Sequence, residues 1–266
     1  MTRLELPIAD KSLGQHFLRD QNVIKKICED FKESAEAIVE IGPGPGILTE
    51  KLAQIHLPYF VIEKDKRFDV YLEQFISPNQ ITLADALQIR LSTFFEEKNI
   101  SLKKIWLVSN LPYNVGSPLL INFLQTPEIK YMTLMFQKEV ADKVFPFSTT
   151  KNAMSSLLVL SQTYFECNLL MKVPPGAFTP APRVDSAVLS MTRRETPLVP
   201  LNEFQKLEKF LRLMFSQKRK QLGGVLKSSY ATTLIDEVFS GLKIEKSIRA
   251  EALSLEQVLT LYRKFV

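Results

Sequence analysis

The chain has 266 residues, of which 45% are hydrophobic and 24% are charged, as in ordinary folded globular proteins. No apolar run reaches the roughly 20 residues that span a membrane, and the N-terminus lacks the apolar region of a signal peptide. The net charge is +5, and the whole excess lies in residues 196–266, with 12 basic and 7 acidic residues. Such a basic end is typical of proteins that bind nucleic acid, although a solvated helical surface would give the same excess.

Cysteine and histidine are scarce in this chain. Cys28 and Cys167, like His16 and His56, are too few and too far apart to indicate a disulfide framework or a metal-binding cluster. A low number of widely spaced cysteines is typical of a reducing compartment. We therefore expect a cytoplasmic protein that binds neither a metal nor a membrane, and we expect it to be a monomer.

Apolar segments alternate with helical patterns along most of the chain, which predicts an α/β fold with a parallel sheet and helices on both faces. Asp20 is a candidate N-cap for a helix that extends to residue 31, because apolar residues recur at helical spacing after it. A hairpin of residues 167–173 with the last strand is also expected. The other predicted strands are 37–41, 59–62, 81–83, 105–108, 132–136 and 187–191, and the predicted helices are 48–55, 65–75, 119–124 and 155–165.

A polar segment with two prolines, Pro197 and Pro200, follows the last predicted strand and indicates a domain boundary. Beyond it, apolar residues keep a helical period over residues 204–215 and again near residues 255–262. We therefore predict two domains. Residues 1–196 would form a Rossmann-like sheet domain, and residues 197–266 would form a small helical domain.

A loop rich in glycine and proline, residues 42–46, follows the strand predicted at 37–41 and precedes a helix. Glycines let the backbone turn sharply and approach a ligand closely. Glu63 and Asp85 follow the next two strands, where an acid can accept hydrogen bonds from ribose hydroxyls or from an adenine amine. Together these features predict a site for a cofactor that contains a nucleoside, and the alternative is a tight turn with two surface acids.

The order of residues in this loop favours S-adenosylmethionine over a dinucleotide. Its glycines occupy the first, third and fifth positions, whereas a dinucleotide-binding loop has them at the first, third and sixth. The two prolines lack the N–H groups that a pyrophosphate needs, and Glu40, just before the loop, would repel phosphate. S-adenosylmethionine carries a sulfonium and an ammonium group, both of which suit a nearby acid. We therefore expect this cofactor and not NAD or FAD.

The tetrapeptide Asn110-Leu111-Pro112-Tyr113 follows a buried strand, at the sheet edge where open α/β proteins bind ligands. The Asn110 amide and the Pro112 carbonyl can accept hydrogen bonds from an adenine amine, and Tyr113 offers a flat face for the base. Asn and Pro are also ordinary turn residues. The tetrapeptide alone therefore leaves a base-binding site and a plain turn both open.

In order and together, the motifs resemble those of the rRNA adenine N6-dimethyltransferase family, and the resemblance covers nearly the whole chain. One departure is Asn152–Ser156, where the family often has a Tyr-Gly-containing segment, and this departure concerns RNA contacts and not the reaction. The matching segments are Gly14–Leu18 with Asp20, Gly42–Thr49, Glu63, Asp85-Ala86, Asn110–Asn114, Gln137–Val140, Val173–Ser186 and Phe215–Lys220.

The resemblance implies that the chain dimethylates the N6 amines of two adjacent adenines near the 3′ end of 16S rRNA, within the small ribosomal subunit. It implies that Phe178 stacks on the target base, although Phe178 could instead belong to the core and His16 could be a packed histidine. The implied catalytic residues are Asn110, Leu111, Pro112, Tyr113 and Phe178. The implied cofactor residues are Gln15, His16, Leu18, Gly42, Gly44, Glu63, Lys64, Asp85, Ala86 and Asn110. The implied RNA-binding residues are Lys218, Arg219 and Lys220, at the start of a predicted helix.

Other functions remain open from sequence alone. A macrolide-resistance methyltransferase that acts on 23S rRNA would share these motifs, as would a mitochondrial relative used in transcription. A ribosome-assembly factor without catalysis would keep the fold, although the intact motif at residues 110–113 argues against lost activity. A nicotinamide dehydrogenase is disfavoured by the glycine loop.

Overall fold

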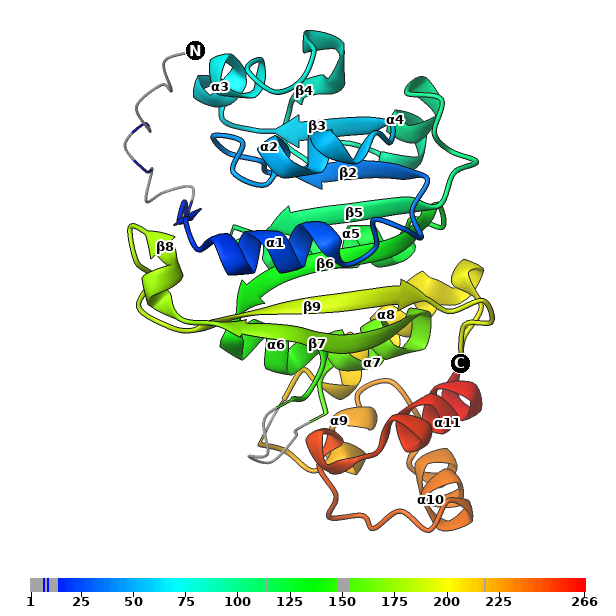
Figure 1. Ribbon diagram of the computed structural model, residues 1–266. Helices are drawn as coiled ribbons and strands as arrows, with labels where there is room; N and C mark the ends of the chain where they lie inside the picture. Colours follow the sequence, from blue (N-terminus) through cyan, green and yellow to red (C-terminus); the bar gives the residue numbers. More distant parts are fainter. Residues whose placement is uncertain (1–6, 8, 10–13, 113, 148–153, 218) are drawn as a thin grey trace. The chain divides into compact units, whose positions relative to one another are not determined.

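The computed structural model describes residues 7, 9, 14–112, 114–147, 154–217 and 219–266 (Figure 1). The predictions for Tyr113 and Lys218 lie outside these residues, as does part of the segment 152–156. The chain forms two compact units, Met1–Ala141 with Glu166–Arg193, and Asp142–Phe165 with Arg194–Val266.

The predicted domain boundary at residue 196 lies three residues beyond Arg193, where the first unit ends. The sequence did not indicate that residues 142–165 belong to the same unit as the C-terminal helices. Long-range contacts explain that grouping. Backbone N–H groups of residues 194 and 198 donate to carbonyls of residues 164 and 163, and the Tyr164 and Phe204 rings lie 5.2 Å apart. No local pattern in the sequence indicates such contacts.

The first unit is built on a seven-stranded sheet with the strand order β4-β3-β2-β5-β6-β9-β7. The five strands β2 to β6 are parallel, and β9 pairs with β6 in the antiparallel direction. From β2 the chain builds outward to β3 and β4 and then returns to β5, so the topological switch point lies between β2 and β5. The strands are β2 (Ala37–Ile41), β3 (Tyr59–Glu63), β4 (Ile81–Leu83), β5 (Ile105–Asn110), β6 (Ile129–Gln137), β7 (Phe165–Val173) and β9 (Ser186–Arg193).

All the predicted strands are confirmed, and β7 lies beside β9 as expected. The strand β5 runs two residues further than predicted and ends at Asn110, so this residue stands at the sheet edge beside the switch point. The helices of this unit are α1 (Gln21–Glu29), α2 (Thr49–Leu52), α3 (Asp69–Leu72), α4 (Leu91–Glu97), α5 (Gly116–Gln125) and α6 (Lys138–Val144), the last of which crosses the boundary between the units.

Helix α1 shows how the sequence directs this packing. The Asp20 carboxylate accepts the N–H groups of Asn22 and Val23, which confirms the predicted N-cap. The apolar side of the helix is buried in one core cluster with α2, α3 and one face of the sheet. The segment predicted as one helix over residues 65–75 is instead a 3₁₀ turn at Lys66–Phe68 followed by the short α3, and α4 and α6 were not predicted.

A second, two-stranded sheet was not predicted. The strand β1 (Phe17–Leu18) pairs with β8 (Phe178–Thr179) in the antiparallel direction, with Leu18 opposite Phe178. The Arg19 N–H extends this pairing to the carbonyl of Ala177 at 2.8 Å. Strands of two residues are too short to give a periodic signal, so only the folded chain reveals this sheet.

The second unit is helical, with α7 (Ser156–Tyr164), α8 (Phe204–Met214), α9 (Leu222–Leu226), α10 (Thr232–Gly241) and α11 (Leu255–Phe265). Ser254 caps α11 through a capping box with Gln257, and the Tyr262 hydroxyl donates to Glu203 at 2.7 Å. Helices α8 and α11 confirm the periodicity predicted for the tail. Among the described residues, no helix has the length and apolar character needed to cross a membrane.

Candidate active site

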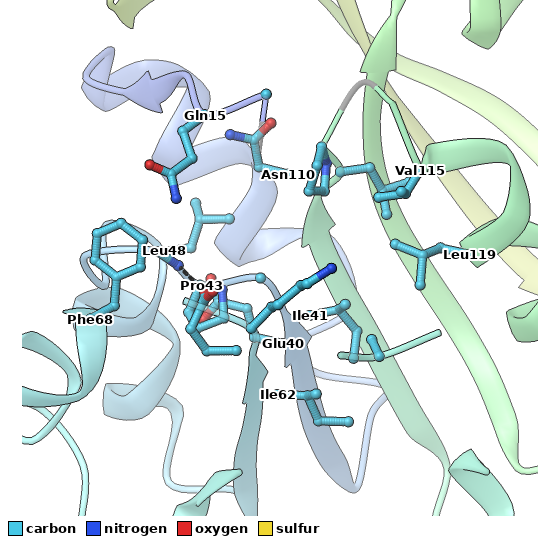
Figure 2. Close-up of a pocket in the computed structure, with 18 of the residues that line it drawn as sticks. Gln15, Glu40, Ile41, Pro43, Leu48, Ile62, Phe68, Asn110, Val115 and Leu119 are labelled. Atoms are coloured by element: carbon cyan, nitrogen blue, oxygen red, sulfur yellow. Dashed lines mark hydrogen bonds between the residues drawn. The ribbon is translucent and has the colours of Figure 1, made fainter. Parts of the chain in front are cut away.

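A cavity opens at the carboxyl ends of β2, β3 and β5, beside the topological switch point (Figure 2). The N-terminal segment 14–18, the glycine loop and the start of α5 complete its wall. All ten residues predicted to bind the cofactor line this one cavity, together with Leu111 and Pro112 of the predicted catalytic set. The structure therefore brings together residues that lie up to 97 positions apart in the chain, while their binding role stays a prediction.

The N–H groups of the three loop glycines are already used within the protein. Gly42 donates to a carbonyl of β3 at 2.9 Å, Gly44 donates to a side-chain carboxylate at 2.8 Å, and Gly46 donates to the carbonyl of Pro43 at 3.1 Å. Pro43 and Pro45 have no N–H to offer. The glycines and prolines of this loop therefore present no N–H group to a pyrophosphate, in agreement with the cofactor class that the sequence favours.

All three glycines of the loop have positive φ, so the backbone geometry requires glycine there. Gly44 and Gly46 have φ values of +57° and +86°, which side-chain-bearing residues rarely adopt. A Cβ atom at Gly46 would also lie 2.8 Å from the Phe75 ring. The loop thus keeps its tight turn against the segment that follows α3 only with glycine at this position.

Glu63, at the end of β3, is the carboxylate that Gly44 contacts. Its Oε2 accepts the Gly44 N–H at 2.8 Å, and its Oε1 accepts the Asp65 N–H at 2.7 Å. The side chain is 5% exposed, and burial raises its pKa although these N–H groups act in the opposite direction. The carboxylate is therefore fixed before any ligand enters, with further lone pairs facing the cavity that it lines.

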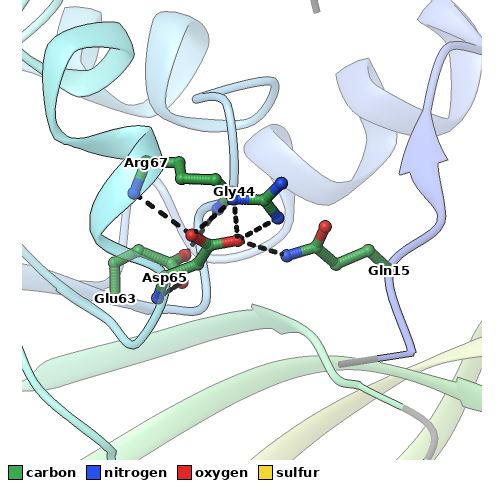
Figure 3. Close-up of polar contacts among 5 residues, drawn as sticks. All are labelled: Gln15, Gly44, Glu63, Asp65 and Arg67. Atoms are coloured by element: carbon green, nitrogen blue, oxygen red, sulfur yellow. Dashed lines mark hydrogen bonds and ion pairs between the residues drawn. The ribbon is translucent and has the colours of Figure 1, made fainter. Parts of the chain in front are cut away.

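Asp65 joins the N-terminal segment to this side of the cavity (Figure 3). The Gln15 amide donates to Asp65 Oδ2 at 2.9 Å, and the Arg67 guanidinium donates to the same carboxylate at distances down to 2.6 Å. Hydrogen bonds from Arg67 lower the Asp65 pKa to about 2. Sequence reasoning missed Asp65, because it looks like an ordinary cap and nothing local connects it to Gln15, 50 residues earlier.

Asp85 follows β4 and pairs with Lys64, whose Nζ lies 2.9 Å from Asp85 Oδ2. The Leu87 N–H donates to the other oxygen at 3.0 Å. The Lys64 hydrogen bond is the main reason that the pKa of Asp85 is lowered. Although several carboxyls line this cavity, no group of three or more His, Cys, Asp or Glu among the described residues could hold a metal ion.

Glu40 lies at the floor of the cavity and is 2% exposed. Its Oε2 accepts hydrogen bonds from the Thr49 hydroxyl at 2.8 Å and from the Tyr59 hydroxyl. Burial raises the Glu40 pKa to about 7, although these two hydroxyls partly counter the effect. The acid that the sequence placed beside the loop is thus held by neighbours of its own chain while it still borders the cavity.

Asn110 and Pro112 form the opposite wall. The Asn110 Nδ2 donates to the His16 carbonyl at 3.2 Å, and no described residue donates to its Oδ1. The Pro112 carbonyl accepts the Val115 N–H at 3.1 Å, which leaves a second lone pair for a ligand. Both predicted acceptors for an amine therefore lie at the cavity, and the amide is oriented by a backbone partner.

Phe178 does not line the cavity. Its side chain is 2% exposed and belongs to the core cluster that also contains Phe17 and Leu18. The pairing of β8 with β1 sets Phe178 opposite Leu18 and turns its ring inward. The ring is therefore buried in this structure, as expected for a core phenylalanine, and the stacking of Phe178 on the target base stays a prediction.

The predicted RNA-binding residues Arg219 and Lys220 are exposed, in the second unit. They form a turn before α9, which begins at Leu222 with Gln221 as its N-cap, so the predicted helix start was too early. With only five residues, α9 also has a weak dipole, because the macrodipole sums over aligned peptide units. Their role in RNA binding stays a prediction that rests on charge and exposure.

Comparison with known proteins gives a consistent result. A family model described as ribosomal RNA adenine dimethylase matches residues 8–265. A relative named ribosomal RNA small subunit methyltransferase A, from Bacillus pumilus (strain SAFR-032), is 34% identical over 93% of this chain and 88% of its own length. A relative of the same name from Chlorobium luteolum is 35% identical over 99% of this chain and 93% of its own length.

Two solved structures share the fold. The 23S rRNA methyltransferase ErmE has a TM-score of 0.67 and 25% sequence identity, with 94% of this chain and 99% of that chain covered. A dimethyladenosine transferase from Plasmodium falciparum has a TM-score of 0.72 and 23% identity, with 92% and 96% covered. These likenesses confirm the predicted fold class of a mainly parallel sheet with helices.

Proposed function

The chain belongs to the ribosomal RNA adenine dimethylase family, and from this premise we propose that it methylates 16S rRNA with S-adenosylmethionine as the methyl donor. The targets would be the N6 amines of two adjacent adenines near the 3′ end, each of which receives two methyl groups. The observation that carries the proposal is the single cavity at the switch point, where the predicted cofactor residues face Asn110 and Pro112.

The cavity fits the donor chemically. Carboxyls of Glu40, Glu63 and Asp85 border it, with Lys64 as a nearby cation, so its polar part favours a positively charged ligand. Apolar side chains such as Ile62 form the rest of the wall and would pack against an adenine ring. Glu63 would accept hydrogen bonds from the ribose hydroxyls, and Asp85 would accept one from the adenine amine of the donor.

S-adenosylmethionine supplies a methyl group on a sulfonium centre, which is a good leaving group. The residues of this chain supply the orientation of the acceptor. The N6 amine of adenine is a poor nucleophile because its lone pair is delocalised into the ring. When Asn110 Oδ1 and the Pro112 carbonyl accept its two hydrogens, the nitrogen is drawn towards a pyramidal geometry with an available lone pair. The N–C bond would form as the methyl–sulfur bond breaks, S-adenosylhomocysteine would leave as a neutral thioether, and the proton that the amine loses would pass to water. Alignment and electrostatics would then provide most of the rate, without a nucleophilic side chain.

The target base must leave its stack to reach this wall, as in other enzymes that modify bases. Tyr113, next to Pro112, is the residue we expect to stack on it, at about 1–3 kcal/mol for such a contact. Phe178 could join only after its ring leaves the core, since it is buried in this structure. The second unit, with its basic surface, would bind the surrounding RNA.

The experiment that tests this function is mass spectrometry of both rRNAs after small and large ribosomal subunits are incubated with the protein and S-adenosylmethionine. The subunits must come from cells that lack the modification. We expect two N6,N6-dimethyladenosines in 16S rRNA and none in 23S rRNA. Methylation of 23S rRNA alone would support the macrolide-resistance alternative, and absence of any methylation would support a role in assembly without catalysis.

A further inference from the structure

Two hydrogen bonds meet at His16 and link the small sheet to the predicted catalytic amide. His16 Nδ1 lies 2.8 Å from the carbonyl oxygen of Pro180. Because a carbonyl cannot donate, the ring nitrogen must carry the proton in this contact. The backbone carbonyl of His16 in turn accepts the Asn110 Nδ2–H at 3.2 Å. The two bonds form a continuous connection from Pro180 to the Asn110 side chain.

The His16 carbonyl is held in place by more than this one contact. Residues 17 and 18 pair with residues 178 and 179 as β1 and β8. Arg19 continues the pairing, with its N–H on the carbonyl of Ala177 at 2.8 Å and its Nε–H on the carbonyl of Gly176 at 3.1 Å. The strand after His16 is therefore fixed along its length, and the His16 ring secures the end that faces the cavity.

An amide side chain has one accepting and one donating end, so its partner decides which end points where. Opposite the His16 carbonyl only the Nδ2 end of Asn110 is tolerated, since the reverse orientation would set two oxygens against each other. This contact leaves Oδ1 as the end that can meet an incoming amine. Figure 2 shows Asn110 on the cavity wall, near Gln15, which precedes His16 in the N-terminal segment.

We propose that His16 is a positioning residue for methyl transfer: its carbonyl sets the orientation of the Asn110 amide, and its ring, bonded to Pro180, keeps that carbonyl in place. This inference rests on the proposed function, because it gives Asn110 Oδ1 the target amine as its partner. It also explains why residue 110 is an amide. A carboxylate is the stronger acceptor for an amine, but it has no N–H and would face the His16 carbonyl with an oxygen.

The first test replaces the amide by an acid of the same shape, Asn110→Asp. This variant keeps an acceptor for the amine, removes the donor to His16 and sets a negatively charged oxygen against the His16 carbonyl. We expect kcat on unmodified small subunits to fall about 10- to 100-fold, as for a partly buried polar contact turned unfavourable, with unchanged melting temperature. Wild-type turnover by Asn110→Asp would overturn the inference. Failure of the wild-type protein itself to methylate would instead refute the proposed function.

The second test compares two variants of His16 with a control. His16→Ala removes the donor to Pro180 and should lower kcat about tenfold. His16→Asn places an N–H where the ring nitrogen stood and should restore most of the turnover. Lys25→Ala, at an exposed position of α1 outside the cavity lining, is the control and should leave both kcat and the KM for S-adenosylmethionine unchanged. Equal losses in His16→Ala and His16→Asn, or a change confined to KM in His16→Ala, would overturn the inference.

The third test asks whether His16 acts through Asn110. In single-turnover measurements with radiolabelled S-adenosylmethionine, His16→Ala should cause no further loss once Asn110→Ala is present. Residues that act through one contact show such non-additive effects, whereas independent residues show additive ones. A further tenfold loss in the double variant would mean that His16 acts independently of Asn110, and the inference would be wrong.

Discussion

The two walls of the cavity are held in different ways. On the side of β3 and β4, short-range contacts fix the polar groups, since Glu63 accepts the N–H of Asp65 two residues later and Asp85 accepts that of Leu87. On the side of β5, Asn110 is held by a carbonyl 94 residues away. Apart from the contact of Gln15 with Asp65, the carboxylates of the cofactor side are thus ordered by nearby segments, whereas the Asn110 amide on the base side depends on a long-range contact with the residue before β1. Catalytic orientation should therefore be easier to disturb than cofactor binding.

The largest expected effect separates the two walls directly. Asn110→Ala removes the side-chain acceptor for the target amine and should lower the rate of methyl transfer by about 1,000-fold, or ~4 kcal/mol. Calorimetry should show little change in the affinity for S-adenosylmethionine, because the fixed carboxylates lie on the other wall. An equal loss of cofactor affinity would make Asn110 mainly a cofactor residue and would remove the distinction between the walls.

The next effect concerns Phe178, which belongs to the core beneath the base side. Phe178→Ala should reduce the free energy of unfolding by about 3 kcal/mol or more, because it empties a large buried volume. Urea unfolding measures this change, and Phe178→Leu is the control that keeps most of the volume. If Phe178→Ala kept its stability but lost activity on RNA, the ring would serve as a stacking platform after all.

The sequence predicted the elements whose signals are local. Every strand of the large sheet was predicted, because each carries apolar and β-branched residues between turn signals. The sequence also predicted that the cofactor residues share one site, because parallel strands bring their carboxyl ends to one edge of the sheet. These residues line one cavity in the structure.

What the sequence could not show depends on contacts between distant segments. The pairing of β1 with β8 joins residues at least 160 positions apart, and this pairing turns Phe178 into the core. The contact of Gln15 with Asp65 and the grouping of residues 142–165 with the tail have the same origin. A family resemblance indicated that Phe178 matters, but not where its ring lies.

Glu40 gives the cofactor side a pH dependence of its own. Its pKa is raised by burial to about 7 in the folded protein, from 4.5. The folded state therefore binds this proton more tightly than the unfolded state, and stability is lost as pH rises from about 4.5 through 7, on the order of 3 kcal/mol. Glu40→Gln stays neutral, so the difference in unfolding free energy between variant and wild type should shift by this amount over that range. Parallel pH profiles would show that Glu40 is not the source.

Glu63→Ala tests the cofactor side itself. It removes a carboxylate that would accept two ribose hydroxyls and should weaken S-adenosylmethionine binding by roughly 1.5–3 kcal/mol, the range for hydrogen bonds to a charged group. Glu73→Ala, which removes an exposed acid of the same unit, should leave binding unchanged. An unaltered dissociation constant for Glu63→Ala would exclude the ribose role, and loss of kcat alone would move Glu63 to the base side.

The smallest effect lies outside both walls, at Arg219 and Lys220 in the second unit. Both side chains are exposed and precede a helix of only five residues, so the structure gives them no internal role. If they bind phosphates of the ribosomal subunit, Arg219→Gln with Lys220→Gln should weaken subunit binding and flatten its dependence on salt, by a slope of about 0.7–0.9 for each phosphate that is no longer neutralised. The affinity for S-adenosylmethionine should stay the same, because its cavity is lined by the first unit alone.

The control is a double variant on exposed positions of α8, Lys206→Gln with Lys209→Gln, which makes an equal change of charge. A salt slope that falls equally in both double variants would mean that the tail attracts RNA through its overall charge and not through the turn before α9.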